Sequence, residues 1–373
     1  MSARTNGTNL PLLISQAELS LWFYSELLVT VIGVILNFVT FVMILRTSSL
    51  RAGSGILIMH QAFSYGAICL VDFLLNPFFV YLQFHNRLVI PSSVCLYSEA
   101  VADIFLQVPY WAMAILALNR LIAVSFPYHY PRFTTKPAVY SCIGFCWFMA
   151  LVSVIPISLG WTGHFHMSAS GRCSHIPNAI GVPYESFLTV AQRIVSGGSY
   201  ILIGLKIIGL HIQRRRNKNV APEKNNSRRK ACQEGTMKRR MDIVKMLFAS
   251  YLWFQACSLP LVVIVTYYPR IYRVPSANLW LRFLSICQFS LDPIIFYILN
   301  KEFRQGYHRL FRTWVVTVRE HSGIVHPASF GRRLTVSIRH NSNFLLRSKA
   351  NGRFGGRREM LRRVLASRTS AST

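Results

Sequence analysis

Seven long apolar stretches are the feature that most constrains what this chain can fold into. A helix that crosses a bilayer needs about 20 mostly apolar residues. Stretches of that kind occupy residues 22–45, 56–82, 94–124, 138–160, 187–210, 243–268 and 277–299. Lipid offers no partners for backbone polar groups, so spans of this length have to be helices. The sequence therefore predicts an all-α membrane protein, a seven-transmembrane helix bundle.

The charge composition supports a membrane protein and argues against nucleic-acid binding. Charged residues make up 14% of the chain, against about 25% in a typical soluble domain. The net charge is +28, but the basic residues concentrate in 214–240 and 301–368, which flank apolar spans. Such blocks indicate anionic membrane lipids and acidic cytoplasmic partners as the counter-charges, and we expect no nucleic acid.

The segment that follows the seventh span has its own pattern. Within residues 301–314, aromatic and aliphatic residues recur at helical spacing with arginines between them: Phe303, Tyr307, Leu310, Phe311 and Trp314. This pattern predicts a short amphipathic eighth helix in the membrane interface; the alternative is a disordered basic tail. Residues 315–373 are rich in Arg, Ser and Gly, and we predict that they form a basic disordered cytoplasmic tail.

The Lys and Arg residues of the connecting segments predict the orientation. One side of the membrane receives Arg46, Arg51, Arg120, Arg132 and Lys136, eleven residues in 214–240, and the whole basic tail. The other side receives Arg4, Arg87, Arg172, Arg270, Arg273 and Arg282. The positive-inside rule then makes residues 1–21 an extracellular N-terminus of a multi-pass plasma-membrane protein. Asn6, in Asn6-Gly7-Thr8, becomes a glycosylation acceptor.

The eight cysteines are unevenly distributed over this topology. Five lie inside spans, where a thiol packs as a small apolar group, and Cys232 falls in a reducing cytoplasmic loop. Cys95 and Cys173 remain as the two that face outward. We predict a disulfide between them, which would hold the loop after the fourth span over the bundle; the alternative is two free thiols.

Several short motifs, spread over about residues 20–314, follow one another in the order and at the spacing of a known protein family. They are Asn37 in the first span, Asn119-Arg120-Leu121, Pro127, Trp147 and Pro156, "CSLP" ending at Pro260, "DPIIF" (Asp292, Pro293 and Phe296), and "NKEFR" from Asn300. Within this set, Arg120 follows Cys95 by 25 residues. Together they resemble the rhodopsin-like (class A) G-protein-coupled receptors. This resemblance implies a receptor that transmits an extracellular signal to heterotrimeric G proteins.

The resemblance implies a switch role for Arg120. In the family this arginine reaches an acidic residue at rest and engages the G protein when the sixth helix moves outward, with Pro127 and Pro260 at the loop and the kink. A simple positive-inside anchor is the alternative. Asn119 departs from the family's acidic residue, and a neutral amide cannot hold the arginine as a carboxylate would. We therefore hypothesise raised basal signalling.

Other departures concern the core. Asp292 replaces the family's seventh-helix asparagine, and Tyr65 stands where the second-helix aspartate of the sodium site is expected. A buried acid in a membrane is usually functional, and we expect Asp292 to be a polar partner of Tyr65 beside the hinge at Pro293; a structural acid is the alternative. Phe296 lacks the hydroxyl of the family's tyrosine, which predicts altered coupling.

The ligand is indicated by acids in the outer half of the second and third spans. Asp72, Glu99 and Asp103 could receive a cationic ligand, a small amine or a basic peptide; acids that only pack helices are the alternative. Phe254 and Ser258 complete the expected pocket, since Ser258 replaces the family's sixth-helix tryptophan. Ala102 stands at the position of the aminergic aspartate, and Ile286 at that of the lysine that binds retinal in visual pigments.

Two other classes of membrane protein are alternatives to a receptor. A transporter or channel would show polar residues across the membrane or inverted repeats, and a membrane hydrolase would show clustered His and acids; neither pattern is present in the sequence. We therefore expect no enzymatic activity, no metal and no cofactor. The segment "RRLTVS" (332–337) resembles a basophilic kinase site, so receptor kinases and arrestin are further expected partners.

Overall fold

The computed structural model describes residues 14–48, 50–51, 54–86, 91–167, 173–217, 227–272 and 274–321. The chain divides into two compact units, Met1–Leu310 and Phe311–Thr373. Seven helices of the described part are long and apolar enough to cross a membrane, which confirms the predicted fold class.

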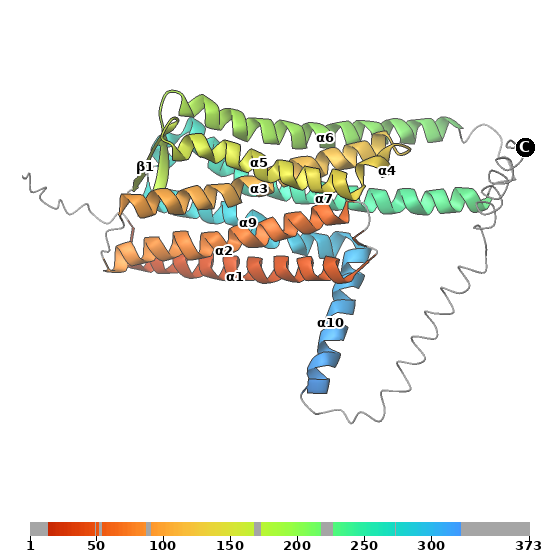
Figure 1. Cartoon of the computed structure of the whole chain (residues 1–373), viewed down its shortest axis with the longest axis horizontal. Coiled ribbons are helices and arrows are strands. Elements are labelled where there is room, and N and C mark those ends of the chain that lie inside the picture. Colours follow the sequence, from red (N-terminus) through yellow and green to blue (C-terminus); the bar gives the residue numbers. More distant parts are fainter. Residues whose placement is uncertain are drawn as a thin grey trace, which may run out of the picture. The chain divides into compact units, whose positions relative to one another are not determined.

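The seven spans belong to α1 (Gln16–Arg46), α2 (Gly55–Asn86), α3 (Ser92–Ser125), α5 (Lys136–Ser158), α6 (Gly181–Asn217), α7 (Ser227–Tyr267) and α9 (Pro275–Leu299). These long helices run side by side in Figure 1. Two short helices, α4 (Tyr130–Phe133) and α8 (Pro269–Tyr272), lie in connections, and α10 (Lys301–His321) follows the last span.

Helix α1 shows how the sequence selects its inward face. Its buried residues recur every three or four positions and include polar side chains, whereas large apolar residues such as Leu28, Ile35 and Phe38 are exposed. This arrangement suits lipid as the solvent, because apolar side chains face hydrocarbon and polar groups find partners inside.

Asn37 shows what those inward polar groups do. Its Nδ2 donates to the carbonyl of Gly33 on its own helix and to that of Phe289 on α9, each at 2.9 Å. Gly33 allows this close approach, since a Cβ there would lie 2.5 Å from Ser290 Oγ and 2.7 Å from Cys69 Sγ. One amide therefore joins α1 to α9 where α2 also makes contact.

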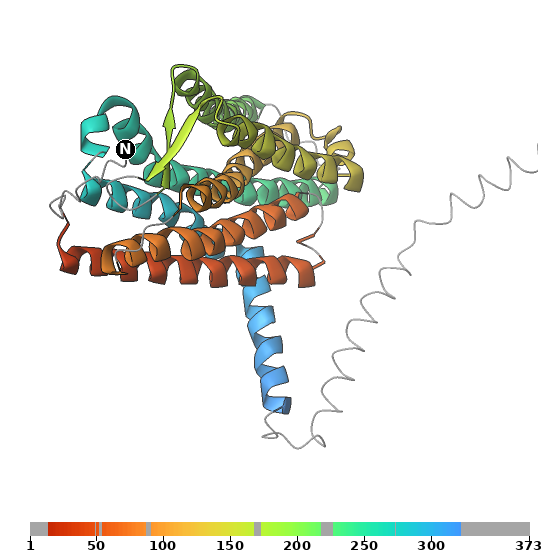
Figure 2. The same ribbon diagram turned by 60° about the vertical axis from the view of Figure 1, so that its left-hand side comes forward.

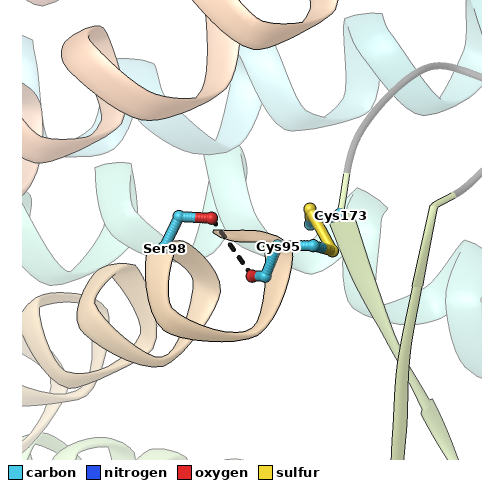
Figure 3. Close-up of a disulfide and its surroundings, with 3 residues drawn as sticks. All are labelled: Cys95, Ser98 and Cys173. Carbon is cyan, nitrogen blue, oxygen red and sulfur yellow. Dashed lines mark hydrogen bonds between the residues drawn. A yellow bond between two sulfur atoms is a disulfide. The ribbon is translucent and has the colours of Figure 1, made fainter. Parts of the chain in front are cut away.

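An antiparallel hairpin of β1 (Gly163–Met167) and β2 (Cys173–Pro177) closes one end of the bundle, with Gly163 opposite Pro177 and Met167 opposite Cys173. The hairpin lies against α3 (Figure 2). A disulfide joins Cys95, near the start of α3, to Cys173 of β2 (Figure 3). The predicted pairing is confirmed. We call the end of the bundle that carries this hairpin the hairpin end. The opposite end, where α4 lies, is called the Arg120 end (Figure 1).

Loss of this disulfide is expected to destabilise the protein by about 2–5 kcal/mol, because the cross-link restricts the unfolded chain. Cys95→Ser should lower the thermal unfolding temperature of the purified protein. Cys142→Ser, which removes a partly buried free thiol, is the matched control. Equal unfolding temperatures for Cys95→Ser and the wild type would contradict this expectation.

The Arg120 end is filled by an apolar cluster that α10 helps to close. Phe296 of α9 packs edge to face on Phe303, with ring centroids 5.5 Å apart. The hydroxyl groups of Tyr307 and Thr40 lie 2.5 Å apart, and burial raises the pKa of Tyr307 to about 12, so the phenol stays neutral. Gly306 permits this packing, because a Cβ there would lie 2.5 Å from Met43 Sδ.

Several boundaries differ from the predicted ones. Helix α6 extends to Asn217 and α7 begins at Ser227, so much of the basic segment 214–240, which the sequence suggested as a connection between spans, is helical. The expected boundaries at residues 22 and 314 lie inside α1 and α10, which begins after a cap at Asn300 and continues to His321. Hydropathy reports only the stretch that lipid would cover, whereas helical hydrogen bonding continues into polar sequence.

Candidate functional site

A cavity of about 80 Å³ lies between α1, α2, α3, α7 and α9, toward the hairpin end. Four carboxyl groups line it, from Glu26, Asp72, Glu99 and Asp103. The three acids that the sequence singled out thus share one cavity. Glu26 was missed, although a glutamate inside an apolar span is a readable signal, because a charged residue there is costly.

Arg282 of α9 lines the same cavity as these acids. The expectation that Arg282 belongs to the cations of the connecting segments is wrong, since the residue lies inside the helix. Its guanidinium donates to the hydroxyl of Tyr272 on α8, at 2.9 and 3.2 Å, and its charge also acts on Glu99 and Asp103. One guanidinium therefore faces four carboxyl groups.

The expected aromatic part of the pocket lies elsewhere. Phe254 lines a cavity of about 10 Å³ between α3, α6 and α7, together with Tyr110 and Arg193. Arg193 donates to Gln255 and its guanidinium carbon lies 5.7 Å from the Phe254 ring centroid. Ser258 is buried and donates to the carbonyl of Phe254 at 2.8 Å, and it lines neither cavity. Tyr110 borders both cavities and so separates them.

Asp292 lies buried at the middle of the bundle, next to the helix proline Pro293. It accepts a hydrogen bond from Ser250 of α7, so this acid joins the two helices that carry Pro260 and Pro293. The Tyr65 hydroxyl accepts a hydrogen bond from Gln61 at 2.7 Å, and Asp292 acts on Tyr65 through its charge, so the expected pairing of these two residues stays a prediction. Asp292 thus bridges α7 and α9.

Arg120 lies near the end of α3 and is 3% exposed. It donates to the hydroxyl of Ser54, just before α2. Neighbouring Asn119 is also buried, and its Oδ1 accepts from Tyr130 of α4 at 3.1 Å. Pro127 is exposed in the connection between α3 and α4. The amide that replaces the family's carboxylate therefore holds the adjoining loop helix.

Three of the sequence-based expectations lie outside the described residues. They are the glycosylation acceptor Asn6, the kinase-like segment 332–337 and the tail beyond residue 321. Among the residues that the structure does describe, no group of three or more His, Cys, Asp or Glu side chains could hold a metal ion.

Comparison with known proteins places this geometry in a family. The family model for "7 transmembrane receptor (rhodopsin family)" matches residues 36–296. Rhodopsin of the fish Abyssocottus korotneffi is 24% identical over 285 residues, which cover 74% of this chain and 93% of that protein. Rhodopsin of the frog Aquarana catesbeiana is 25% identical over 157 residues, 41% of this chain and 43% of that protein.

The fold agrees with this match. Squid rhodopsin superposes with a TM-score of 0.69 at 16% identity, covering 82% of this chain and 88% of that structure. The matching segment of the frog relatives spans less than half of their length. Because the family model covers most of the chain, including all seven helices in whole or in part, the protein is a multi-pass membrane protein that belongs to the rhodopsin family of seven-transmembrane receptors.

Proposed function

We propose that this receptor carries the signal of a cationic extracellular ligand, a small amine or basic peptide, to heterotrimeric G proteins. It does so from the plasma membrane, with residues 1–21 outside and the basic tail in the cytoplasm. The observation that carries the proposal is the buried Arg120, which lies near the end of α3, whereas the disulfide to the hairpin is at the start of that helix. Membership in a receptor family supports it.

The acidic cavity supports a cationic ligand. With four carboxyl groups and one guanidinium, its lining attracts positive charge. Its volume of about 80 Å³ is well below the roughly 300–1,000 Å³ of pockets for drug-sized ligands. An ammonium group fits such a space, and the remainder of the ligand would lie toward the hairpin.

Retinal does not fit this lining. The position at which a visual pigment carries its Schiff-base lysine is Ile286, which is buried and borders the acidic cavity. An aliphatic side chain cannot form an imine with an aldehyde. The similarity to rhodopsins therefore concerns the family and the fold, and not the ligand.

A screen of biogenic amines and basic peptides on expressing cells, read by cAMP and calcium, tests the ligand class. For an active compound, Asp103→Asn or Glu99→Gln should raise the half-maximal concentration by about 10–100-fold, because each acid would otherwise bind the charged ligand. Glu18→Gln is the control, since Glu18 lies at the same end and contacts Ser276 and Trp280 instead. A neutral agonist with unchanged potency on Asp103→Asn would overturn the assignment of a cationic ligand.

Asn119 provides a test of the resting state. In Asn119→Asp the carboxylate still accepts the Tyr130 hydrogen bond and adds a negative charge beside Arg120. We expect agonist-independent signalling per receptor at the cell surface to fall about fivefold, which corresponds to a typical coupling energy. Unchanged basal signalling would show that this amide does not set the resting equilibrium.

A further inference from the structure

The small cavity between α3, α6 and α7 contains a cation, Arg193, that plays no part in the proposed binding of a cationic ligand. Arg193 lies near the middle of the span Gly181–Gly209. At a rise of 1.5 Å per residue, either end of this span is about 18 Å or more away along the helix axis. An arginine side chain is shorter than that, so its guanidinium has to find a counter-charge inside the bundle.

No carboxylate of the described residues supplies this counter-charge. Arg193 donates to Gln255 Oε1, and its guanidinium carbon lies 5.7 Å from the Phe254 ring centroid. The groups that act electrostatically on the guanidinium are Tyr110 and Tyr251, which are uncharged at neutral pH. Of the described residues that line the cavity, none is acidic. An amide and an aromatic ring stabilise the guanidinium, but they leave its positive charge uncompensated.

The lining of this cavity also offers hydrogen-bond donors. The Tyr251 hydroxyl accepts from Gln255 Nε2 at 2.6 Å, and its own proton has no acceptor among the described residues. The Thr189 hydroxyl makes no hydrogen bond within the described part of the chain, and Thr189 lines the cavity too. Two hydroxyl donors and one guanidinium therefore line the same small space, and an anion would give all three a partner.

The size of the space limits which anion can bind. Its volume of about 10 Å³ is close to the roughly 10–15 Å³ that one water molecule needs. A monatomic ion fits such a space after small shifts of the side chains, whereas a carboxylate or a phosphate brings several heavy atoms. A water molecule would also fit, but it would bring no negative charge.

We propose that this cavity is a chloride site. Arg193 supplies the positive charge, and the hydroxyl groups of Thr189 and Tyr251 donate hydrogen bonds to the ion. Chloride accepts several hydrogen bonds at once and neutralises the guanidinium without a carboxylate. Because Arg193 and Thr189 belong to α6 and Tyr251 belongs to α7, the bound ion holds these two helices together.

Thermal unfolding in two salts tests the site. The full chain, in phosphatidylcholine nanodiscs, is unfolded at constant ionic strength while sodium gluconate is replaced by sodium chloride. The unfolding temperature should rise by about 2–4 °C and reach a plateau, because an ion that binds only the folded state stabilises it by mass action. Bromide should act like chloride, since it is also monatomic, whereas gluconate is too large for the cavity.

Three variants separate a site from a general effect of salt. Arg193→Gln should abolish the dependence on chloride, because a neutral amide needs no counter-ion. Lys206→Gln removes an exposed cation of the same helix that does not line the cavity, and it should keep the full shift. Thr189→Val keeps the shape of the side chain but removes a donor, so the half-maximal chloride concentration should rise about tenfold. This variant and the wild type still test the site if Arg193→Gln does not fold.

Three results would overturn the proposal. Equal unfolding temperatures of the wild type in chloride and gluconate would show that no chloride is bound. A full chloride shift in Arg193→Gln would assign the effect to the salt and not to this cation. In crystals soaked with bromide, the anomalous signal should lie between Arg193, Thr189 and Tyr251, and its absence there would exclude the site. These measurements use neither agonist nor G protein, so their failure would leave the proposed function untouched.

Discussion

Arg120→Ala is expected to abolish G-protein signalling, both basal and agonist-dependent, while leaving the receptor folded at the cell surface. The side chain is buried and donates to Ser54, so at rest it contributes to the contact between α3 and the start of α2. Removing a buried cation also removes its desolvation cost, which limits the loss of stability. We expect cAMP or calcium responses at the level of cells that lack the receptor.

The control for this prediction is Arg132→Ala, which removes an exposed arginine from α4 at the same end of the bundle. It should retain most of the wild-type signal. Arg120→Lys keeps the charge but loses the planar fork of donors, and we expect it to restore only part of the response. Wild-type signalling by Arg120→Ala, at matched surface expression, would reduce this arginine to a simple anchor in the membrane interface.

Arg282→Gln is expected to destabilise the receptor by about 3–5 kcal/mol, the usual consequence of removing one partner from a buried cluster of charges. The substitution leaves four carboxyl groups around one cavity without their guanidinium and deprives the Tyr272 hydroxyl of its donor. The measurement is thermal unfolding of the purified receptor in nanodiscs.

Arg270→Gln removes an exposed arginine of α8 at the same end and should have little effect on stability. A double variant makes the interpretation specific. If repulsion among the acids causes the loss, then Glu99→Gln should partly rescue Arg282→Gln, and the two effects should not add. Additive effects, or an unfolding temperature unchanged by Arg282→Gln, would show that this arginine does not balance the acids.

The helical fold could be predicted from the sequence because the length of each apolar stretch matches the thickness of the hydrocarbon core of a membrane. About 20 apolar residues mark each span, and the two outward cysteines identified the disulfide between Cys95 and Cys173. The end of α6 and the start of α7 could not be predicted in this way. Both lie inside the basic segment, where the residues are polar throughout and hydropathy does not mark the helix boundary. The β1–β2 hairpin was also missed, since strands of only five residues are too short for their periodicity to stand out.

The candidate site was only partly predictable. Asp72, Glu99 and Asp103 were selected as outer acids, but their shared cavity depends on the rotation of three helices, which the sequence does not specify. Arg282 and Arg193 were readable as charges inside spans, yet their partners, Tyr272 and Gln255, come from neighbouring elements. The same reason applies to Asp292, because its hydrogen-bond partner, Ser250, comes from α7.

The central claim is that this chain activates heterotrimeric G proteins through its Arg120 end. The most direct measurement is GDP release from purified heterotrimers of each class, with the receptor in nanodiscs containing anionic lipid. The account predicts that the wild-type receptor accelerates release from at least one class, that an agonist from the cationic screen increases it, and that Arg120→Ala does neither. Release that stays at the intrinsic rate for every heterotrimer, with agonist bound, would contradict the account.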